Sequence, residues 1–186
     1  MKDKFWEIYS SSISRKGNMD LIEWLYGTDF FDAPASTRYH SNYQGGLCEH
    51  SVHVWEELVR LLHSYPEIKT TAETAAIITL LHDLCKIGCY KTEMRNKKEN
   101  GIWKSVPTYV FKEDFCFGGH GSKSVYLIQK YMPLTDEEAV AINCHMGFAD
   151  RVPGDYSNGN AYEQNPLAWL LHVADESATY VRESSI

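Results

Sequence analysis

The sequence Leu-Leu-His82-Asp83-Leu-Cys-Lys86 places two adjacent ionisable side chains at the end of a very apolar segment. Burying a histidine and an aspartate there is costly unless they are paired or bound to a cation. Each has an ordinary alternative: His82 as a core histidine bonded to a backbone carbonyl, and Asp83 as a solvent-exposed residue at a helix end. The helix dipole, however, disfavours an anion near a C-terminus, and a bound cation would remove that conflict.

Four further residues of the same two kinds fall at the edges of predicted helices: His50, His120, His145 and Asp175. Any one of them could be a helix cap or a surface residue, but six such side chains at the edges of apolar helices in one small domain are harder to explain in that way. Mixed imidazole and carboxylate ligands suit Mn, Fe, Co, Ni or Zn better than Ca or Mg. The set contains no cysteine, which argues against a structural zinc site.

Hydrophobic periodicity predicts that mostly helices position these side chains. We expect helices over residues 3–12, 19–27, 47–64, 71–84, 122–131, 135–145 and 166–181. The segment 71–84 is apolar nearly all round, so it is predicted to be a buried central helix. Thr135 followed by Glu138 is typical of a capping box at the start of a helix.

Two segments depart from the helical pattern. Residues 89–112 alternate as strands do, around Lys97 to Gly101, which predicts a β-hairpin. Residues 148–165 are polar and are predicted to form a long loop, a kind of segment that is often functional. The predicted fold is therefore mainly α, a single domain over residues 1–186 built as a helical bundle with one β-hairpin insertion.

Composition narrows the classes of protein that remain. The chain has 186 residues and a formal net charge of −7, which weakens the case for a long nucleic-acid substrate. No apolar run has the length of about 20 residues that a membrane helix needs. An odd number of cysteines, five, without a secretion signal predicts reduced thiols and a cytoplasmic location.

The motifs GGLCEHS around His50 and LLHDLCKIG around His82-Asp83, followed by the late Asp175, resemble the HD superfamily of metal-dependent phosphohydrolases. The added His120 and His145 resemble the two-metal members, such as the HD-GYP phosphodiesterases, although the GYP motif is missing. The stretch YHSNYQGGLCEHS is also similar to the HD domain of certain bacterial exoribonucleases. The resemblance covers roughly residues 40–180 and implies an HD-domain helical bundle.

The resemblance also implies a role for each residue of the set. One divalent transition-metal ion would be held by His50, His82, Asp83 and Asp175, and Asp83 would bridge to a second ion held also by His120 and His145. Asp83 and Lys86 would carry catalysis, with Lys86 also contacting substrate phosphate. The alternative for Lys86 is a lysine whose positive charge interacts favourably with the helix dipole at a C-terminus. Arg151 is a further candidate phosphate contact, against the alternative of a surface arginine.

These observations predict a hydrolase that uses a metal-activated water on a phosphomonoester or phosphodiester of a nucleotide. The expected partner is a small phosphorylated substrate, with no membrane; the sequence predicts no particular oligomer. A related interpretation is a nuclease that trims short single strands. Two interpretations of other classes remain, a non-catalytic nucleotide-binding HD module and a di-iron HD oxygenase.

Overall fold

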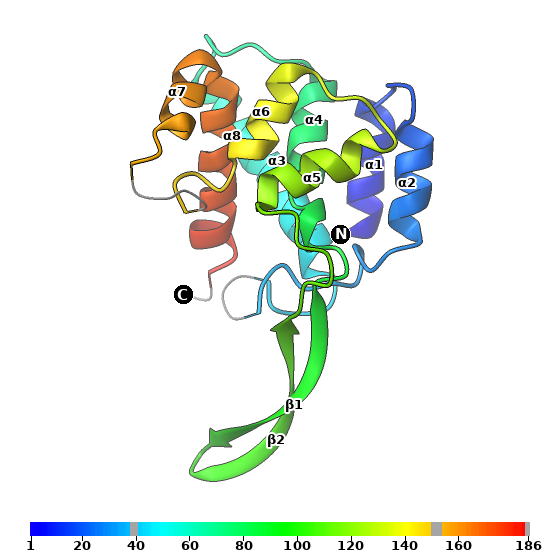
Figure 1. The fold of residues 1–186 in the computed structure, drawn as a ribbon, viewed down its shortest axis with the longest axis vertical. Helices are drawn as coiled ribbons and strands as arrows, with labels where there is room; N and C mark the ends of the chain where they lie inside the picture. The colour runs from blue at the N-terminus through cyan, green and yellow to red at the C-terminus, as the bar shows by residue number, and fades with distance from the viewer. Residues whose placement is uncertain (38–40, 150–153, 185–186) are drawn as a thin grey trace.

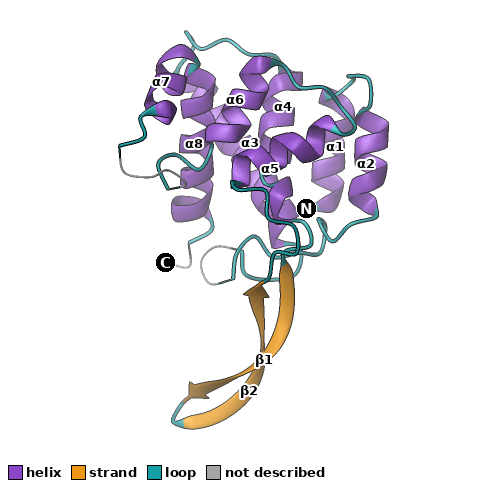
Figure 2. Ribbon diagram, in the orientation of Figure 1, coloured by secondary structure: helices purple, strands orange, loops and turns teal. Residues whose placement is uncertain are grey.

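The structure, a computed structural model, describes residues 1–37, 41–149 and 154–184. The described helices are α1 (Lys2–Ser12), α2 (Asn18–Tyr26), α3 (Gly46–Ser64), α4 (Ala72–Leu81), α5 (His120–Gln129), α6 (Asp136–Cys144), α7 (Ser157–Gln164) and α8 (Pro166–Ser177). They form one helical body from which a single β-hairpin projects (Figure 1; Figure 2). The predicted mainly α fold with a β-hairpin is confirmed. None of the described helices combines the length and the apolarity needed to cross a lipid bilayer.

Helix α4 lies in the middle of the body, packed against α1, α3 and α6. Eight of its ten residues are buried, as its continuous apolar sequence predicts. Thr71 caps its start, where the side chain accepts a hydrogen bond from the Thr74 amide at 3.0 Å. The helix ends at Leu81 rather than at Leu84 as expected, because Asp83 leaves the helical conformation and a 3₁₀ turn follows at Leu84–Lys86.

Helix α6 repeats this design beside α4. Its predicted capping box is present, since the Thr135 side chain and the Glu138 side chain each accept from the other residue's backbone amide. A histidine follows the last helical residue in both cases, His82 after α4 and His145 after α6, with the same backbone angles, φ −59° and ψ −33°. The two helices therefore place His82 and His145 in the same backbone conformation at their C-terminal ends.

The hairpin consists of β1 (Tyr90–Glu99) and β2 (Ile102–Phe111), paired antiparallel from Tyr90 opposite Phe111 to Glu99 opposite Ile102. Asn100 and Gly101 form the turn with positive φ angles of 50° and 83°. Two consecutive positive φ angles match the right-handed twist of the paired strands, which explains the Asn-Gly pair. Most hairpin side chains are exposed, and the ribbon curves away from the helical body (Figure 1).

The predicted loop over residues 148–165 is wrong in its second half, where α7 forms at Ser157–Gln164. Its sequence, SNGNAYEQ, has no apolar period, so no local pattern indicates a helix. Contacts with the segment after α6 hold it instead. Asn158 is buried and donates to the Gly147 carbonyl, and the Tyr162 hydroxyl donates to the Cys144 carbonyl at 2.9 Å. Tertiary hydrogen bonds have overridden local propensity here.

Candidate metal centre

Five side chains from four helices meet at one end of the helical body. His50 comes from the first turns of α3, His82 and Asp83 from the end of α4, His145 from the end of α6, and Asp175 from α8. The first four are buried, and Asp175 is partly exposed. The packing of α3 against α4 and α8, and of α6 against α8, brings these residues together from positions far apart in the sequence.

Asp83 lies at the centre of the group. Its Oδ2 is 3.5 Å from His82 Nε2 and 3.8 Å from His50 Nε2, and its Oδ1 is 3.6 Å from His145 Nε2. Asp175 joins from the other side, with its Oδ1 at 3.0 Å from His50 Nε2. Two sets of three donors, His50–His82–Asp83 and His82–His145–Asp175, each have all their ligand atoms within 4.8 Å of one another.

The tautomers of two of these histidines are fixed by the backbone. His82 Nδ1 is 2.7 Å from the Thr79 carbonyl oxygen, and His145 Nδ1 is 2.7 Å from the Ile142 carbonyl oxygen. Because a carbonyl only accepts, each Nδ1 donates its proton, and Nε2 is the ring nitrogen that faces Asp83. Both Nε2 atoms are buried and lack a hydrogen-bond partner among the described residues.

A buried polar atom without a partner is costly, on the order of 1–3 kcal/mol each. Two such nitrogen lone pairs face two carboxylates here. A divalent cation bound among them would satisfy all of these atoms at once, so the donor set fits a metal ion. Imidazole and carboxylate donors without a thiolate favour a transition metal such as Mn, Fe, Co, Ni or Zn.

Glu183 is a member of the site that the sequence did not indicate. Its Oε1 lies 3.1 Å from His50 Nδ1 and 2.8 Å from His53 Nδ1, and its Oε2 accepts from the Ser41 hydroxyl at 2.8 Å. A carboxylate behind a metal-binding histidine orients the ring and raises its basicity. The spacing of His50 and His53 puts both on one face of α3. This spacing indicates a shared hydrogen-bond partner, but it does not identify that partner as Glu183.

The electrostatics of the site favour the cation-binding forms of His82 and of the two carboxylates. For His145, burial lowers the pKa, but the neighbouring Asp83 outweighs burial and raises that pKa. Burial is the main cause that lowers the pKa of His82 to about 4, so its ring is neutral near pH 7. Burial also pushes the pKa of Asp83 upward, but Lys86 and the neighbouring histidines outweigh it and hold that pKa well below its usual value. For Asp175, the hydrogen bond to His50 likewise outweighs burial, and the pKa is lowered.

The pKa of His50 is set by the two carboxylates beside it. Burial alone would lower its pKa, but hydrogen bonds with Asp175 and Glu183 outweigh burial and raise the pKa to about 9. Without a metal ion, the proton on His50 therefore compensates part of the negative charge of the cluster. Metal binding to Nε2 would release that proton.

Lys86 and His120 flank the cluster. Lys86 Nζ lies 2.6 Å from Asp83 Oδ2, and burial of the amine, which lowers its pKa, is outweighed by Asp83, which raises it. His120, at the start of α5, has its Nδ1 3.6 Å from the Cys85 sulfur, which is itself 3.8 Å from Asp83 Oδ1. In the described part of the chain neither residue belongs to the two donor sets, so a ligand role for His120 and a phosphate contact for Lys86 stay predictions.

Arg151, the other predicted phosphate contact, lies outside the described residues. The structure therefore brings together five of the six predicted ligands, places His120 and Lys86 beside them, and adds Glu183 behind His50.

Comparison with known proteins gave one match. The family model of the HD domain matches residues 47–180, well over half of the chain. The match includes all six predicted ligands and ends before Glu183. No curated protein and no solved structure gave a significant match.

Proposed function

The chain belongs to the HD domain family, whose members are typically metal-dependent hydrolases, and we propose that it hydrolyses a phosphomonoester or phosphodiester of a nucleotide. The observation that supports this proposal is the buried cluster of three Nε2 atoms and two carboxylates, joined by the ammonium group of Lys86. We propose that His50, His82, Asp83, His145 and Asp175 hold the metal, and that His120 helps to hold a second ion if one binds.

A divalent transition metal in such a centre supplies a water of lowered pKa and positive charge for the phosphate oxygens. Phosphoryl transfer then depends on positioning and charge neutralisation, and a protein nucleophile is not needed. The residues that surround the donors provide the positioning. The Thr79 and Ile142 carbonyls hold the rings of His82 and His145, and Glu183 holds the ring of His50.

Lys86 has two roles in this proposal. Its ammonium group keeps Asp83 ionised, because the two groups are 2.6 Å apart and both are shielded from solvent. Its side chain is 14% exposed, so part of it reaches the surface beside the cluster. From there we propose that it contacts a phosphate oxygen of the substrate.

The test is elemental analysis of the purified protein, followed by hydrolysis assays with Mn, Fe, Co, Ni or Zn. The substrates are p-nitrophenyl phosphate, bis(p-nitrophenyl) phosphate, nucleoside monophosphates and cyclic dinucleotides. We expect turnover that chelators abolish and that added metal restores. Metal binding without hydrolysis of any phosphoester would contradict the proposal. Tight nucleotide binding without turnover would then indicate a binding module, and oxygen consumption by a mixed-valence di-iron form would indicate an oxygenase.

A further inference from the structure

A cavity of about 560 Å³ lies between the hairpin and the loop that precedes α3. Thr37 and Asn42 line it from the loop, and Arg95, Lys97, Tyr109 and Phe111 are among the hairpin residues that line it. We call it the hairpin cavity. Its volume is within the range of sites that bind small molecules, roughly 300–1,000 Å³.

The strand register sorts the hairpin side chains onto two faces, because directly paired residues share a face and neighbours along a strand alternate. One face carries Lys91, Glu93, Arg95 and Lys97, with Lys104 opposite Lys97. The other face carries Met94, Trp103, Tyr109 and Phe111 together with Lys98. The ribbon therefore has four of its five cationic residues on one side and its aromatic residues on the other.

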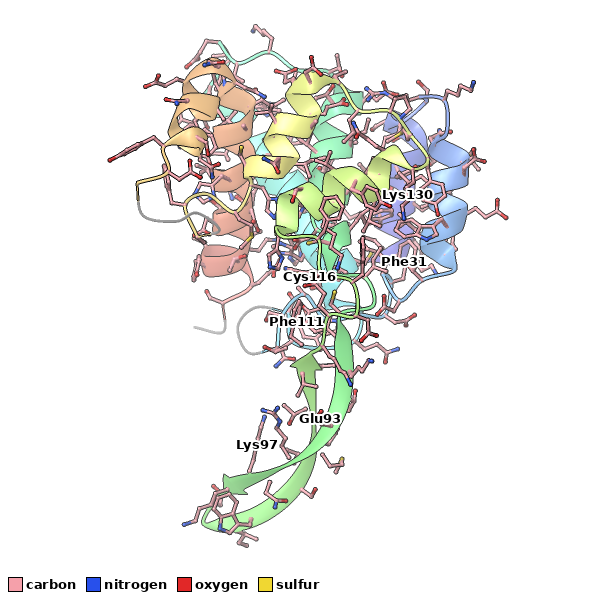
Figure 3. All side chains as sticks on the ribbon, in the orientation of Figure 1. Phe31, Glu93, Lys97, Phe111, Cys116 and Lys130 are labelled. Atoms are coloured by element: carbon pink, nitrogen blue, oxygen red, sulfur yellow. The ribbon has the colours of Figure 1, made fainter. Side chains whose placement is uncertain are left out.

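The cationic face lines the hairpin cavity through Arg95 and Lys97 (Figure 3 labels Lys97 and, at the base of the hairpin, Phe111). Within the described residues Lys97 forms no ion pair. Arg95 meets Glu93 at 3.7 Å, with both side chains about half exposed, so that pair is weak. Residues 90–111 carry five cationic and two anionic residues on a chain whose net charge is −7. Positive charge is thus concentrated on the hairpin of an otherwise acidic protein.

Described residues of the loop before α3 link the hairpin to the metal centre. The Tyr90 hydroxyl, at the start of β1, donates to the Ala35 carbonyl at 3.0 Å. Ser41, in the same loop, donates to Glu183, which in turn meets His50. The strand β1 also begins four residues after Lys86. The base of the hairpin is therefore connected to the metal centre both through this loop and along the chain.

We propose that the hairpin cavity binds a second phosphate group of a short oligonucleotide whose reacting phosphate lies at the metal centre. This inference rests on the proposed function, and it selects a chain of several nucleotides over a mononucleotide as the substrate. The strand from Tyr90 to Lys97 spans roughly 23 Å at 3.3 Å per residue, more than a mononucleotide reaches. The planar fork of Arg95 suits two oxygens of one phosphate, and Lys97 adds a point charge.

Two features of the hairpin cavity favour a short nucleotide chain over other anions. Tyr109 and Phe111, which belong to the other face of the hairpin, also line the cavity, and aromatic side chains are the usual platforms for unpaired bases. The acidic charge of the rest of the molecule opposes a long nucleic acid, which would have to pass close to it.

The test measures binding and not turnover, so its outcome is separate from that of the hydrolysis assays. A 5′-phosphorylated pentadeoxyadenylate with a 3′ fluorophore is titrated with the full chain in EDTA, and deoxyadenosine monophosphate with the same fluorophore serves as the short probe. The double variant Arg95→Gln/Lys97→Gln removes the two cations of the cavity. The double variant Lys98→Gln/Lys130→Gln removes two charges elsewhere, one on the other face of the hairpin and one at the end of α5 (Figure 3).

We expect the pentanucleotide to bind at least about tenfold more tightly than the mononucleotide. The variant Arg95→Gln/Lys97→Gln is expected to remove that advantage and to reduce the salt dependence of binding by about one charge per substituted residue. The variant Lys98→Gln/Lys130→Gln is expected to keep the advantage, and circular dichroism checks that both variants fold. Equal binding of the two probes by the wild type, or equal losses in the two variants, would overturn the inference. Hydrolysis of p-nitrophenyl phosphate by the Mn-loaded wild type shows separately whether the proposed function stands.

Discussion

Helices α4 and α6 carry a cluster of buried charge at each end, and the two clusters differ in how well their atoms are satisfied. At the N-terminal ends, Arg15 donates to both carboxylate oxygens of Glu138, at 2.5 and 2.9 Å. Glu138 also accepts from the Thr74 hydroxyl at 2.9 Å and from the Thr135 amide at 2.9 Å. Both carboxylate oxygens of this fully buried residue therefore have partners.

At the C-terminal ends of the same helices, the Nε2 atoms of His82 and His145 have no hydrogen-bond partner among the described residues. The helix dipoles add to the contrast, since they favour Glu138 at an N-terminus and disfavour Asp83 at a C-terminus. The first cluster is complete with the protein's own atoms, whereas the second leaves two imidazole nitrogens without a hydrogen-bond partner among the described residues. The comparison contrasts a buried ionic cluster that is satisfied within the fold with one that has donor atoms left for the ion that we propose.

The substitution with the largest expected effect is Asp83→Asn, which removes the central carboxylate without changing its size. We expect loss of bound metal and a fall in phosphoester hydrolysis of at least about a thousandfold, because the amide oxygen is a weaker ligand for the ion. Elemental analysis and steady-state kinetics measure the two effects. Asp114→Asn, at an exposed position, is the control. Full metal content in Asp83→Asn would show that the cluster is not centred on this residue.

The next largest effect is expected at the opposite end, for Arg15→Met. Removing the guanidinium leaves the Glu138 charge buried and uncompensated, which should lower the free energy of unfolding by about 3 kcal/mol. Arg60→Met is the matched control, because Arg60 pairs with Glu57 but its side chain is 76% exposed, so we expect a loss below about 1 kcal/mol. Urea denaturation of both variants measures the difference. Equal losses would mean that burial does not distinguish the two pairs.

A smaller effect is expected for Glu183→Gln, which keeps the shape of the side chain that holds His50 but removes its charge. We expect metal affinity to fall by about ten- to a hundredfold, since outer carboxylates tune histidine ligands by this amount. Competition with a fluorescent chelator measures the affinity. Glu176→Gln, on the exposed side of α8, should bind metal as the wild type does. Unchanged affinity in Glu183→Gln would reduce Glu183 to a structural residue.

The smallest effect concerns acid stability. Burial raises the pKa of Glu138, but the hydrogen bond from Arg15 and its other partners outweigh burial and lower the pKa below the ordinary 4.5. A lowered folded-state pKa contributes stability that is present above pH 4.5 and is lost as the pH falls through the lowered value. Glu138→Gln should therefore show a shallower loss of unfolding free energy below pH 4.5 than the wild type. Parallel curves from denaturant melts at several pH values would contradict this.

Much of the fold and of the metal centre could be predicted because the signals are local. The apolar run before His82 predicts a buried helix, the Thr135–Glu138 pair predicts the cap of α6, and the segment from Lys97 to Gly101 predicts the hairpin turn. For the proposed ligands, the first signal was a polar pair at the end of an apolar helix, which is costly to bury. The full set came from the resemblance to the HD superfamily.

The parts that could not be predicted depend on contacts between distant segments. Glu183 contacts His50 across 133 positions of sequence and follows a π-helical segment at Ala178–Arg182. No periodic pattern in the sequence predicts that contact. Helix α7 is likewise held by side chains such as Asn158 that bond to a preceding segment. Periodicity reports which face of an element is buried, but it does not report which other element lies against that face.

The distribution of the donors along the chain has a consequence for biosynthesis. A nascent polypeptide that has emerged from the ribosome as far as His145 still lacks Asp175 and the carboxylate of Glu183. If these residues hold the proposed ion, the ligand set becomes complete only after α8 has docked, and any earlier binding depends on His50, His82 and Asp83 with His145. The tightest binding of the ion should accordingly be a late step in the folding of newly made protein.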